Sequence, residues 1–155
     1  MATDVEMMRY VTGGRPWSPE RIDGFLARQN AFLARNGLAF GAVERSSDGE
    51  VIGLCGIQPL DAGSLDGHFE LGWWIWRDHW GRGYASEASR AVLHYARDVL
   101  RLDRLLAVID PPNAASIRVA EKLGMRFRHV LPAQATRSER DDKPVALYEI
   151  RFGDP

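Results

Sequence analysis

The spacing of apolar residues predicts a helix near the start of the chain and a hairpin after it. Ser18–Glu20 combines a capping serine, a proline and an acid, and apolar residues then recur at helical spacing as far as Asn36–Gly37. Two apolar stretches, Leu38–Arg45 and Val51–Ile57, flank a turn-forming segment at 46–50. We therefore expect one amphipathic helix followed by a β-hairpin.

The rest of the chain alternates between strand-like and helix-like segments. The expected strands are His68–Trp76, Leu105–Ile109, Met125–Val130 and Val145–Phe152, and the expected helices are Tyr84–Leu100 and Ala114–Leu123, with Gly124 ending the second. The inner stripe of the long helix is expected to consist of Ala88, Ala91, Val92, Tyr95, Ala96 and Val99. This order predicts an α/β fold, a mixed sheet with helices on both faces.

Composition narrows the class of protein. A length of 155 residues with 45% hydrophobic and 26% charged residues fits one globular domain over residues 1–155. The longest apolar runs, Leu71–Trp76 and Leu105–Ile109, fall far short of the ~20 residues that span a bilayer, and no signal-peptide pattern opens the chain. We expect a cytoplasmic protein without a membrane partner. A single cysteine, Cys55, permits no internal disulfide and no cysteine-based zinc site.

Charge is unevenly distributed along the chain, although the net charge is only −1. Arg77–Arg128 holds ten Lys/Arg against six Asp/Glu, whereas the remainder holds ten against fifteen. A modest basic bias in one stretch fits a small polyanion such as a nucleotide cofactor better than a nucleic acid. A solvated charged surface is the alternative explanation.

A glycine-rich turn lies between an expected strand and the long helix. It consists of Gly81, Arg82, Gly83, Tyr84 and Ala85. Such a turn exposes backbone N–H groups at the positive end of a helix dipole, and its small residues leave room for phosphate oxygens against the backbone. The sequence thus indicates a phosphate site here, and a merely tight connection is the alternative.

Two known phosphate-binding patterns fit this turn poorly. The Walker pattern is absent. The dinucleotide fingerprint is nearly met by Gly81, Gly83 and Ser86, but its third glycine is missing. The acid some twenty residues on, Asp103, precedes its strand, whereas a ribose-binding acid belongs at the far end of that strand.

Three segments together resemble one protein family. They read DVEMMRYVTGGRPWSPE at 4–20, HWGRGYASEASRAVLHYA at 79–96 and PPNAASIRVAEKLGMRF at 111–127. The latter two resemble the acyl-CoA-binding core of the GNAT N-acetyltransferases. The first is similar to the N-terminal region of the branch that contains the RimJ and RimL ribosomal-protein N-terminal acetyltransferases. The resemblance covers nearly the whole chain and implies a GNAT-like, mostly antiparallel sheet.

The resemblance implies an activity and an acyl donor. The chain would transfer an acetyl group from acetyl-CoA to a primary amine, by direct attack in a ternary complex and without a metal. The acceptor would be a small molecule or the N-terminal amine of a peptide or protein. A non-catalytic acyl-CoA-binding regulatory module is the alternative function.

The resemblance also assigns residues to the acyl donor. Trp80, Gly83 and Ala85 would occupy the marked positions of the family's pyrophosphate loop, with Trp80 in place of the usual Gln or Arg. Residues at the end of the preceding strand would pair through their backbone with the pantetheine arm and splay away from the next strand; they are Trp74, Ile75 and Trp76.

The start of the second helix would complete the donor site. Asn113 would hydrogen-bond the pantetheine arm, and Ser116 would lie near the thioester sulfur. Ala120 stands where the wider family often has a tyrosine that acts as general acid, and Ser116 shares its helix face through i,i+4 spacing. Ser116 is therefore the candidate proton donor. Asn113 and Ser116 as ordinary helix-capping residues are the alternative.

Glu70 is the candidate anchor of a water relay that removes the proton from the amine. It directly precedes the apolar run Leu71–Trp74, in a strand that could point it at the acceptor. A relay suffices for an α-amine, whose pKa lies near neutrality, but not for a lysine-type amine. His68 is a weaker rival, and an ordinary carboxylate at the start of a strand is the alternative reading of Glu70.

The front of the chain departs from the family pattern. Relatives usually have a further strand and half a helix before the equivalent of Asp4. Either the chain begins late, or the sheet lacks its first edge strand and a partner chain or another segment covers the gap. The second possibility makes a homodimer an expectation.

Overall fold

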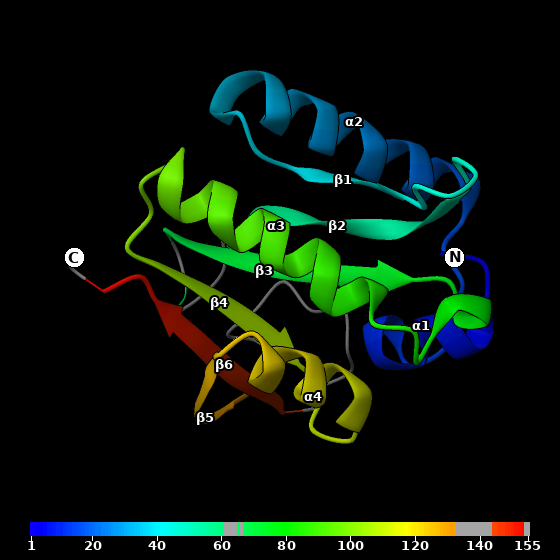
Figure 1. The fold of residues 1–155 in the computed structure, drawn as a ribbon. Helices are drawn as coiled ribbons and strands as arrows, with labels where there is room; N and C mark the ends of the chain where they lie inside the picture. Colours follow the sequence, from blue (N-terminus) through cyan, green and yellow to red (C-terminus); the bar gives the residue numbers. More distant parts are fainter. Residues whose placement is uncertain (61–64, 66, 133–143, 154–155) are drawn as a thin grey trace.

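The computed structural model describes residues 1–60, 65, 67–132 and 144–153, which form an α/β fold around one open sheet (Figure 1). The α-helices of this part are α1 (Val5–Thr12), α2 (Pro19–Asn36), α3 (Tyr84–Asp98) and α4 (Ala114–Lys122), with a short 3-10 turn η2 (Arg77–His79). The strands are β1 (Phe40–Glu44), β2 (Val51–Leu60), β3 (His68–Ile75), β4 (Arg104–Ile109), β5 (Arg126–Leu131) and β6 (Val145–Arg151). The predicted elements are confirmed, within a few residues at their ends.

The six strands lie in the order β1-β2-β3-β4-β6-β5. All neighbours are antiparallel except β3 and β4, which run parallel because α3 connects them as a crossover. β1 forms one edge, and no strand precedes α1 among the described residues. The expected mixed, mostly antiparallel sheet is confirmed. In the described part of the chain, no helix is long and apolar enough to cross a membrane.

The local chemistry of α2 explains its boundaries. The hydroxyl of Ser18 accepts from the backbone N–H of Arg21 at 3.3 Å, and Pro19 occupies the first helical position, where its missing N–H costs nothing. At the other end Gly37 adopts a left-handed conformation (φ 70°) and donates to the carbonyl of Leu33 at 2.9 Å. Both ends lie where the sequence places them.

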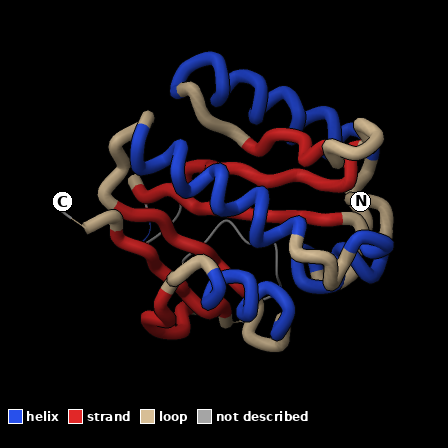
Figure 2. Tube along the Cα trace, in the orientation of Figure 1, coloured by secondary structure: helices blue, strands red, loops and turns tan. Residues whose placement is uncertain are grey.

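Helices cover both faces of the sheet. Side chains alternate along β3, so that Leu71 and Trp73 join the main core, while Trp74 points to the opposite face. α3 and α4 contact each other and supply Leu93 and Leu123 to the main core, and both lie over the same face (Figures 1 and 2). On the other face, Phe25 of α2 stacks on Trp74 with ring centroids 6.1 Å apart.

The expected inner stripe of α3 is partly wrong. Its buried residues are Ser86, Ser89, Leu93 and Ala96, with Ala88 and Val92 half-buried. Ala91, Tyr95 and Val99 are exposed, the last with 61% of its surface. The helix approaches the sheet closely enough that the hydroxyl of Ser89 lies 3.5 Å from the thiol of Cys55, which leaves room only for small side chains. Tyr95 instead donates its hydroxyl proton to the carbonyl of Gly37 at 3.0 Å.

Glycines allow the first three strands to pack closely. A Cβ at Gly56 would lie 2.0 Å from the carbonyl oxygen of Ala39, and one at Gly72 would lie 2.4 Å from the ring of Phe40. A Cβ at Gly53 would lie 2.3 Å from the carbonyl oxygen of Trp74. Because two of these obstacles are backbone atoms, a side chain at Gly53 or Gly56 would have to push the strands apart.

We expect Gly56→Ala to lower the free energy of unfolding by about 2 kcal/mol or more, because the added methyl group overlaps backbone that cannot rotate away. Urea unfolding followed by tryptophan fluorescence measures the loss. Gly153→Ala is the matched control, since its Cβ would meet nothing within 4 Å, and its stability should stay within about 0.5 kcal/mol of the wild type. Equal stabilities of the two variants would contradict this account.

Candidate active site

The sheet opens between β3 and β4. β2 pairs with β3 along its whole length, from Leu60 with His68 to Gly53 with Ile75. The other side of β3 faces β4, and both strands are described in full. Here β3 pairs with β4 at the single position Glu70–Leu106. Beyond Glu70 the two strands diverge towards the η2 end (Figure 1). The expected splay is therefore present, and it leaves the β4-facing edge of β3 without a strand partner.

The glycine turn stands at the open end of this cleft. Gly81 (φ 73°) and Gly83 (φ 90°) are both left-handed, and a Cβ at either position would meet nothing within 4 Å. Gly83 is the N-cap of α3, and no side chain caps this helix start. The first backbone N–H groups of α3 thus face an open space that suits an anion. Arg82 is exposed beside them.

Trp80 holds the turn against the end of β3. Its indole N–H donates to the carbonyl oxygen of Ile75 at 2.6 Å, while the N–H of Trp76 donates to the carbonyl of Ile52 at 2.8 Å. The side-chain donor of Trp80 is therefore used within the protein. Trp80 thus shapes the loop through this hydrogen bond, at the position where the family pattern has Gln or Arg.

The β1–β2 turn supports the same loop from the other side, which the sequence analysis missed. Arg45 lies 3.5 Å from Nδ1 of His79 and also binds Asp48 and Glu50, at 2.5 Å each. Nε2 of His79 lies 3.7 Å from Glu50, and its ring meets that of Tyr84 edge to face. Polar residues in a hairpin turn carry no sequence signal for a contact with a loop some thirty residues away.

At the start of α4, Asn113 acts as the N-cap. Its side-chain oxygen accepts from the N–H of Ser116 at 3.1 Å, so this oxygen has the ordinary role of a helix cap. The amide N–H₂ of Asn113 takes no part in that bond. Ser116 is half-buried, and Ala120, one turn further on, is fully buried. α3 and α4 both begin at the end of the sheet where β3 and β4 part (Figure 1).

Glu70 lies where the strands separate, on the face opposite α3 and α4. Alternation along β3 puts it on the same side as Trp74. It is half-buried, and Gln58 of β2 donates to its Oε2 at 2.8 Å. A carboxylate has about four acceptor positions, so this one bond does not exhaust the capacity of Glu70 to accept hydrogen bonds.

His68, the rival base, is engaged by Arg104. Nη2 of Arg104 lies 3.0 Å from Nε2 of His68, and a guanidinium can only donate. Nε2 must therefore accept this hydrogen bond, which places the ring proton on Nδ1. The lone pair of Nε2 is thus occupied by Arg104, whereas Glu70 is contacted by the neutral amide of Gln58.

Glu149 is a buried carboxylate that the sequence analysis missed. Only 6% of its side chain is exposed, and it is bound by Arg128, by Arg151 at 3.1 Å and by Arg104 at 3.7 Å. Burial raises the pKa of Glu149, but hydrogen bonds from Arg151 and Arg128 outweigh burial and hold this pKa below 4.5. The cluster lies across Leu106 from Glu70 and carries more guanidinium groups than carboxylates.

An aromatic cluster lies on the same face of the sheet, further along β3. Trp17 packs against Trp74 and Phe25, with ring centroids 5.4 Å apart in both pairs. Arg21 lies over the Trp17 ring at 4.7 Å. Among the described residues, the buried indole N–H of Trp17 has no hydrogen-bond partner. Trp74, which the sequence predicts to contact the acyl donor, thus directs its side chain into this cluster, while its backbone borders the cleft.

Comparison with known proteins identifies the family. Residues 1–126 match the sequence model of the acetyltransferase (GNAT) domain. The chain belongs to the GNAT family. It is 39% identical over 113 residues to the uncharacterized protein YkkB of Bacillus subtilis, which covers 73% of this chain and 61% of YkkB. The chain therefore spans less than two thirds of the length of this relative.

Solved GNAT structures share the fold. An acetyltransferase of Agrobacterium tumefaciens superposes with a TM-score of 0.74 at 28% identity, over 97% of this chain and 83% of that one. The yncA protein of Salmonella typhimurium, solved with its cofactor acetyl-CoA, has a TM-score of 0.73 at 20% identity, over 97% and 86% of the two chains. Within the described residues, no group of three His, Cys, Asp or Glu side chains is placed to hold a metal ion.

We expect Gly83→Ala to weaken the binding of CoA by about tenfold or more, because a side chain both strains the left-handed backbone and enters the space in front of the N–H groups. Isothermal calorimetry measures the affinity. Gly124→Ala is the matched control. Gly124 has φ 80°, also faces open space, and follows the C-terminal end of α4, whereas the site uses the N-terminal end of that helix. It should lose comparable stability and keep its affinity, and a similar loss of affinity in both variants would count against the assignment.

The buried ion cluster should make folding stability depend on acid pH. Because the pKa of Glu149 is lower in the folded state, its charge stabilises the fold above about pH 4.5, and this contribution disappears as the pH falls further. The stability difference between wild type and Glu149→Gln should therefore shrink between pH 6 and pH 3, as denaturant unfolding can measure. Glu6→Gln, which removes an exposed pair with Arg9, is the control and should change little at any pH.

Proposed function

We propose that this chain is an acetyl-CoA-dependent N-acetyltransferase that acts on a primary amine. The observation that carries the proposal is the opening of the sheet beyond Glu70, with a helix start that no side chain caps on one face and a carboxylate on the other. A thioester can reach the opening from the side of α3 and α4, and an amine from the opposite side. The family membership supports the same activity.

The residues of the cleft would hold the donor mainly through backbone groups. The N–H groups of residues 81–85 bind the diphosphate at the start of α3, and the backbone at residues 74–76, at the end of β3, pairs with the amides of the pantetheine arm. This pairing uses the backbone groups that remain, because the Ile75 carbonyl accepts from Trp80 and the Trp76 N–H donates to Ile52. The amide N–H₂ of Asn113 donates to the same arm. Acetyl-CoA supplies the thioester carbon that the amine attacks. Holding amine and thioester together lowers the barrier by up to about 7 to 11 kcal/mol in well-oriented reactions.

Glu70 would accept the proton of the attacking amine through a water molecule. An α-amine with a pKa near 8 is roughly 10% unprotonated at pH 7, whereas a lysine is only about 0.04% unprotonated, a difference of about 3.5 kcal/mol. A half-buried carboxylate acting through water is a modest base, which suits an α-amine. We therefore favour the N-terminus of a peptide or protein, or a small-molecule amine of similar pKa, as the acceptor.

Ser116 is our candidate for the proton donor to the departing thiolate. Ala120 offers no acidic group, and Ser116 lies one turn before it on the same side of α4. Its N–H is held by Asn113, which fixes the start of the helix and with it the position of the hydroxyl. A thiolate is a good enough leaving group to tolerate a weak acid at this position.

The narrower RimJ/RimL-like branch stays a prediction. The ribosomal-protein-S5-alanine acetyltransferase of Vibrio fischeri has a TM-score of 0.71 with this chain at 16% identity, over 88% of this chain and 74% of that one, which shows a common fold alone. Homodimerisation likewise stays a prediction, and light scattering that finds a monomer at micromolar concentration would contradict it.

The activity is tested by incubating the protein with acetyl-CoA and a panel of peptides with free N-termini, spermine and aminoglycosides, while released thiol is followed. We expect turnover with at least one peptide or small amine. Calorimetry with CoA provides the second measurement. Binding of CoA without turnover of any amine would favour the non-catalytic acyl-CoA-binding module, and the absence of binding would reject both functions.

We expect Glu70→Gln to reduce kcat by about 10- to 100-fold without abolishing it, because most of the acceleration comes from positioning. The loss should be largest at low pH, where free amine is scarce. Thiol release across pH 6 to 9 gives the profile. His68→Gln is the matched comparison and should keep the wild-type profile, since Arg104 already occupies Nε2. An unchanged kcat in Glu70→Gln would show that the assignment is wrong.

A further inference from the structure

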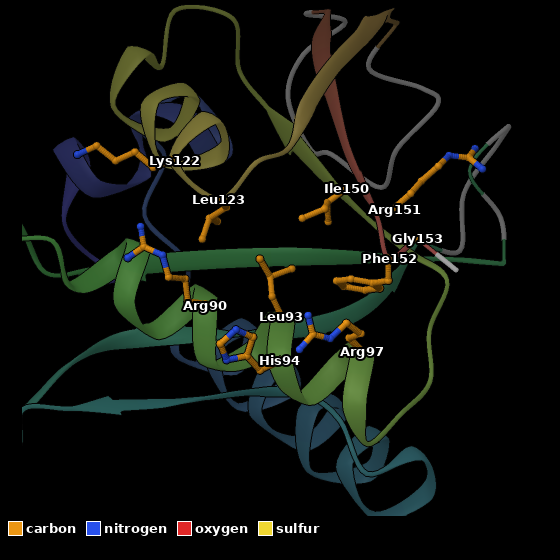
Figure 3. A pocket seen from close by; sticks show the side chains of 10 residues that line it. All are labelled: Arg90, Leu93, His94, Arg97, Lys122, Leu123, Ile150, Arg151, Phe152 and Gly153. Carbon is orange, nitrogen blue, oxygen red and sulfur yellow. The ribbon is translucent and has the colours of Figure 1, made fainter. Parts of the chain in front are cut away.

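A second candidate site lies in a groove between the C-terminal halves of α3 and α4 and the end of β6 (Figure 3). Its volume is about 420 Å³. It is lined by Arg90, Leu93, His94, Arg97, Lys122, Leu123, Ile150, Arg151, Phe152 and Gly153. A space of this size suits a small molecule.

The groove has an apolar floor and a basic rim. Leu93, Leu123, Ile150 and Phe152 converge at its centre (Figure 3). Among the described residues no acidic side chain lines the groove, and five basic side chains form its rim: Arg90, His94, Arg97, Lys122 and Arg151. An apolar floor beneath cations is the arrangement that recognises an anionic group attached to an apolar body.

The basic side chains of α3 are the best placed to bind an anion above the apolar floor. Arg90 and Arg97 are seven residues apart, two turns of helix, and therefore share one side of α3 with Leu93 between them. The side chains of Lys122 and Arg151 point outward at the two ends of the groove (Figure 3). They contribute to the local potential without reaching over the floor.

Much of this positive charge lacks an acidic partner. Arg97 pairs with Asp98 at 2.7 Å, and Arg151 pairs with Glu149. Ion pairs between described residues include neither Arg90 nor Lys122. An anion at Arg90 would therefore displace no carboxylate of the described residues, whereas at Arg97 it would share the guanidinium with Asp98.

The groove is separate from the proposed donor site. The donor site uses the starts of α3 and α4, whereas the groove lies along their later turns, and the two helices run to the same end of the sheet (Figure 1). Arg90, the lining residue of α3 nearest to the donor site, is six residues beyond Tyr84, which is about 9 Å along a helix axis. A ligand of the groove and the diphosphate at Gly81–Ala85 can thus be bound at the same time.

We propose that this groove binds a small anionic amphipathic molecule, with a carboxylate, sulfonate or phosphate at Arg90 and Arg97 and an apolar body on Leu93, Leu123 and Phe152. The site is a second one, and it does not depend on acetyl transfer. Its volume lies within the range of about 300 to 1,000 Å³ that is typical of small-molecule pockets.

Two fluorescent probes that share an apolar body test the proposal. Anilinonaphthalene sulfonate carries an anion, and N-phenylnaphthylamine lacks it. Both are titrated into the folded protein with saturating CoA, so that the donor site is filled. We expect the sulfonate to bind at least about fivefold more tightly than the neutral probe, as one charge-assisted contact in a partly solvated groove predicts.

Variants locate the binding. Arg90→Gln and Arg97→Gln should each weaken the sulfonate by about threefold or more and leave the neutral probe unchanged, because only the charge-assisted contact is lost. Arg35→Gln, an exposed arginine at the end of α2, is the matched control. Methyl resonances of Leu93, Leu123 and Ile150 should shift on adding the sulfonate, and near-ultraviolet circular dichroism confirms that each variant is folded.

Three results would overturn the proposal. They are equal affinities for the two probes, no effect of either arginine variant, and methyl shifts confined to residues outside the groove. Failure of the protein to acetylate any amine would not affect it, because every measurement here is a binding measurement.

Discussion

The parallel pairing of β3 with β4 at one position governs the rest of this structure. Each strand is fully paired on its outer side, β3 with β2 and β4 with β6, so the backbone pairing of the sheet is interrupted at the seam between them. The close packing that Gly53 and Gly56 allow fixes one half. The opening is therefore a property of the folded sheet and needs no ligand to create it.

The two faces of this seam differ in chemistry. The face under α3 and α4 offers backbone N–H groups and helix starts, which suit a large anion. The other face carries side chains: Glu70, the arginines around Glu149, and the aromatic cluster at Trp17. Backbone groups therefore dominate one face of the seam and side chains the other.

The sequence predicts the elements well, because capping residues and glycines mark their ends independently of tertiary structure. Ser18, Gly37 and Gly124 act where the sequence places them. The burial of α3 is predicted less well, since Ser89 faces the core on account of a close approach to Cys55 that hydropathy does not encode. Apolarity indicates a buried face only where the helix has space for large side chains.

The candidate site is harder to predict than the fold. Pairs such as His68 with Arg104 join residues 36 positions apart, and only the strand order brings them together. The role of Asn113 is ambiguous for a different reason, because the same residue type caps helices and binds amides. The sequence therefore names candidate site residues, and the strand order and register decide which of these residues contact one another.

The bond from the Trp80 indole to the carbonyl of Ile75 has a thermodynamic consequence. It ties the last residue of β3 to the turn that follows, so the curvature of that turn is set during folding. A ligand that binds at this turn does not have to order a flexible segment, so its binding free energy carries no entropic cost for that ordering. Rapid, nearly rigid-body association is the kinetic behaviour that such preorganisation favours.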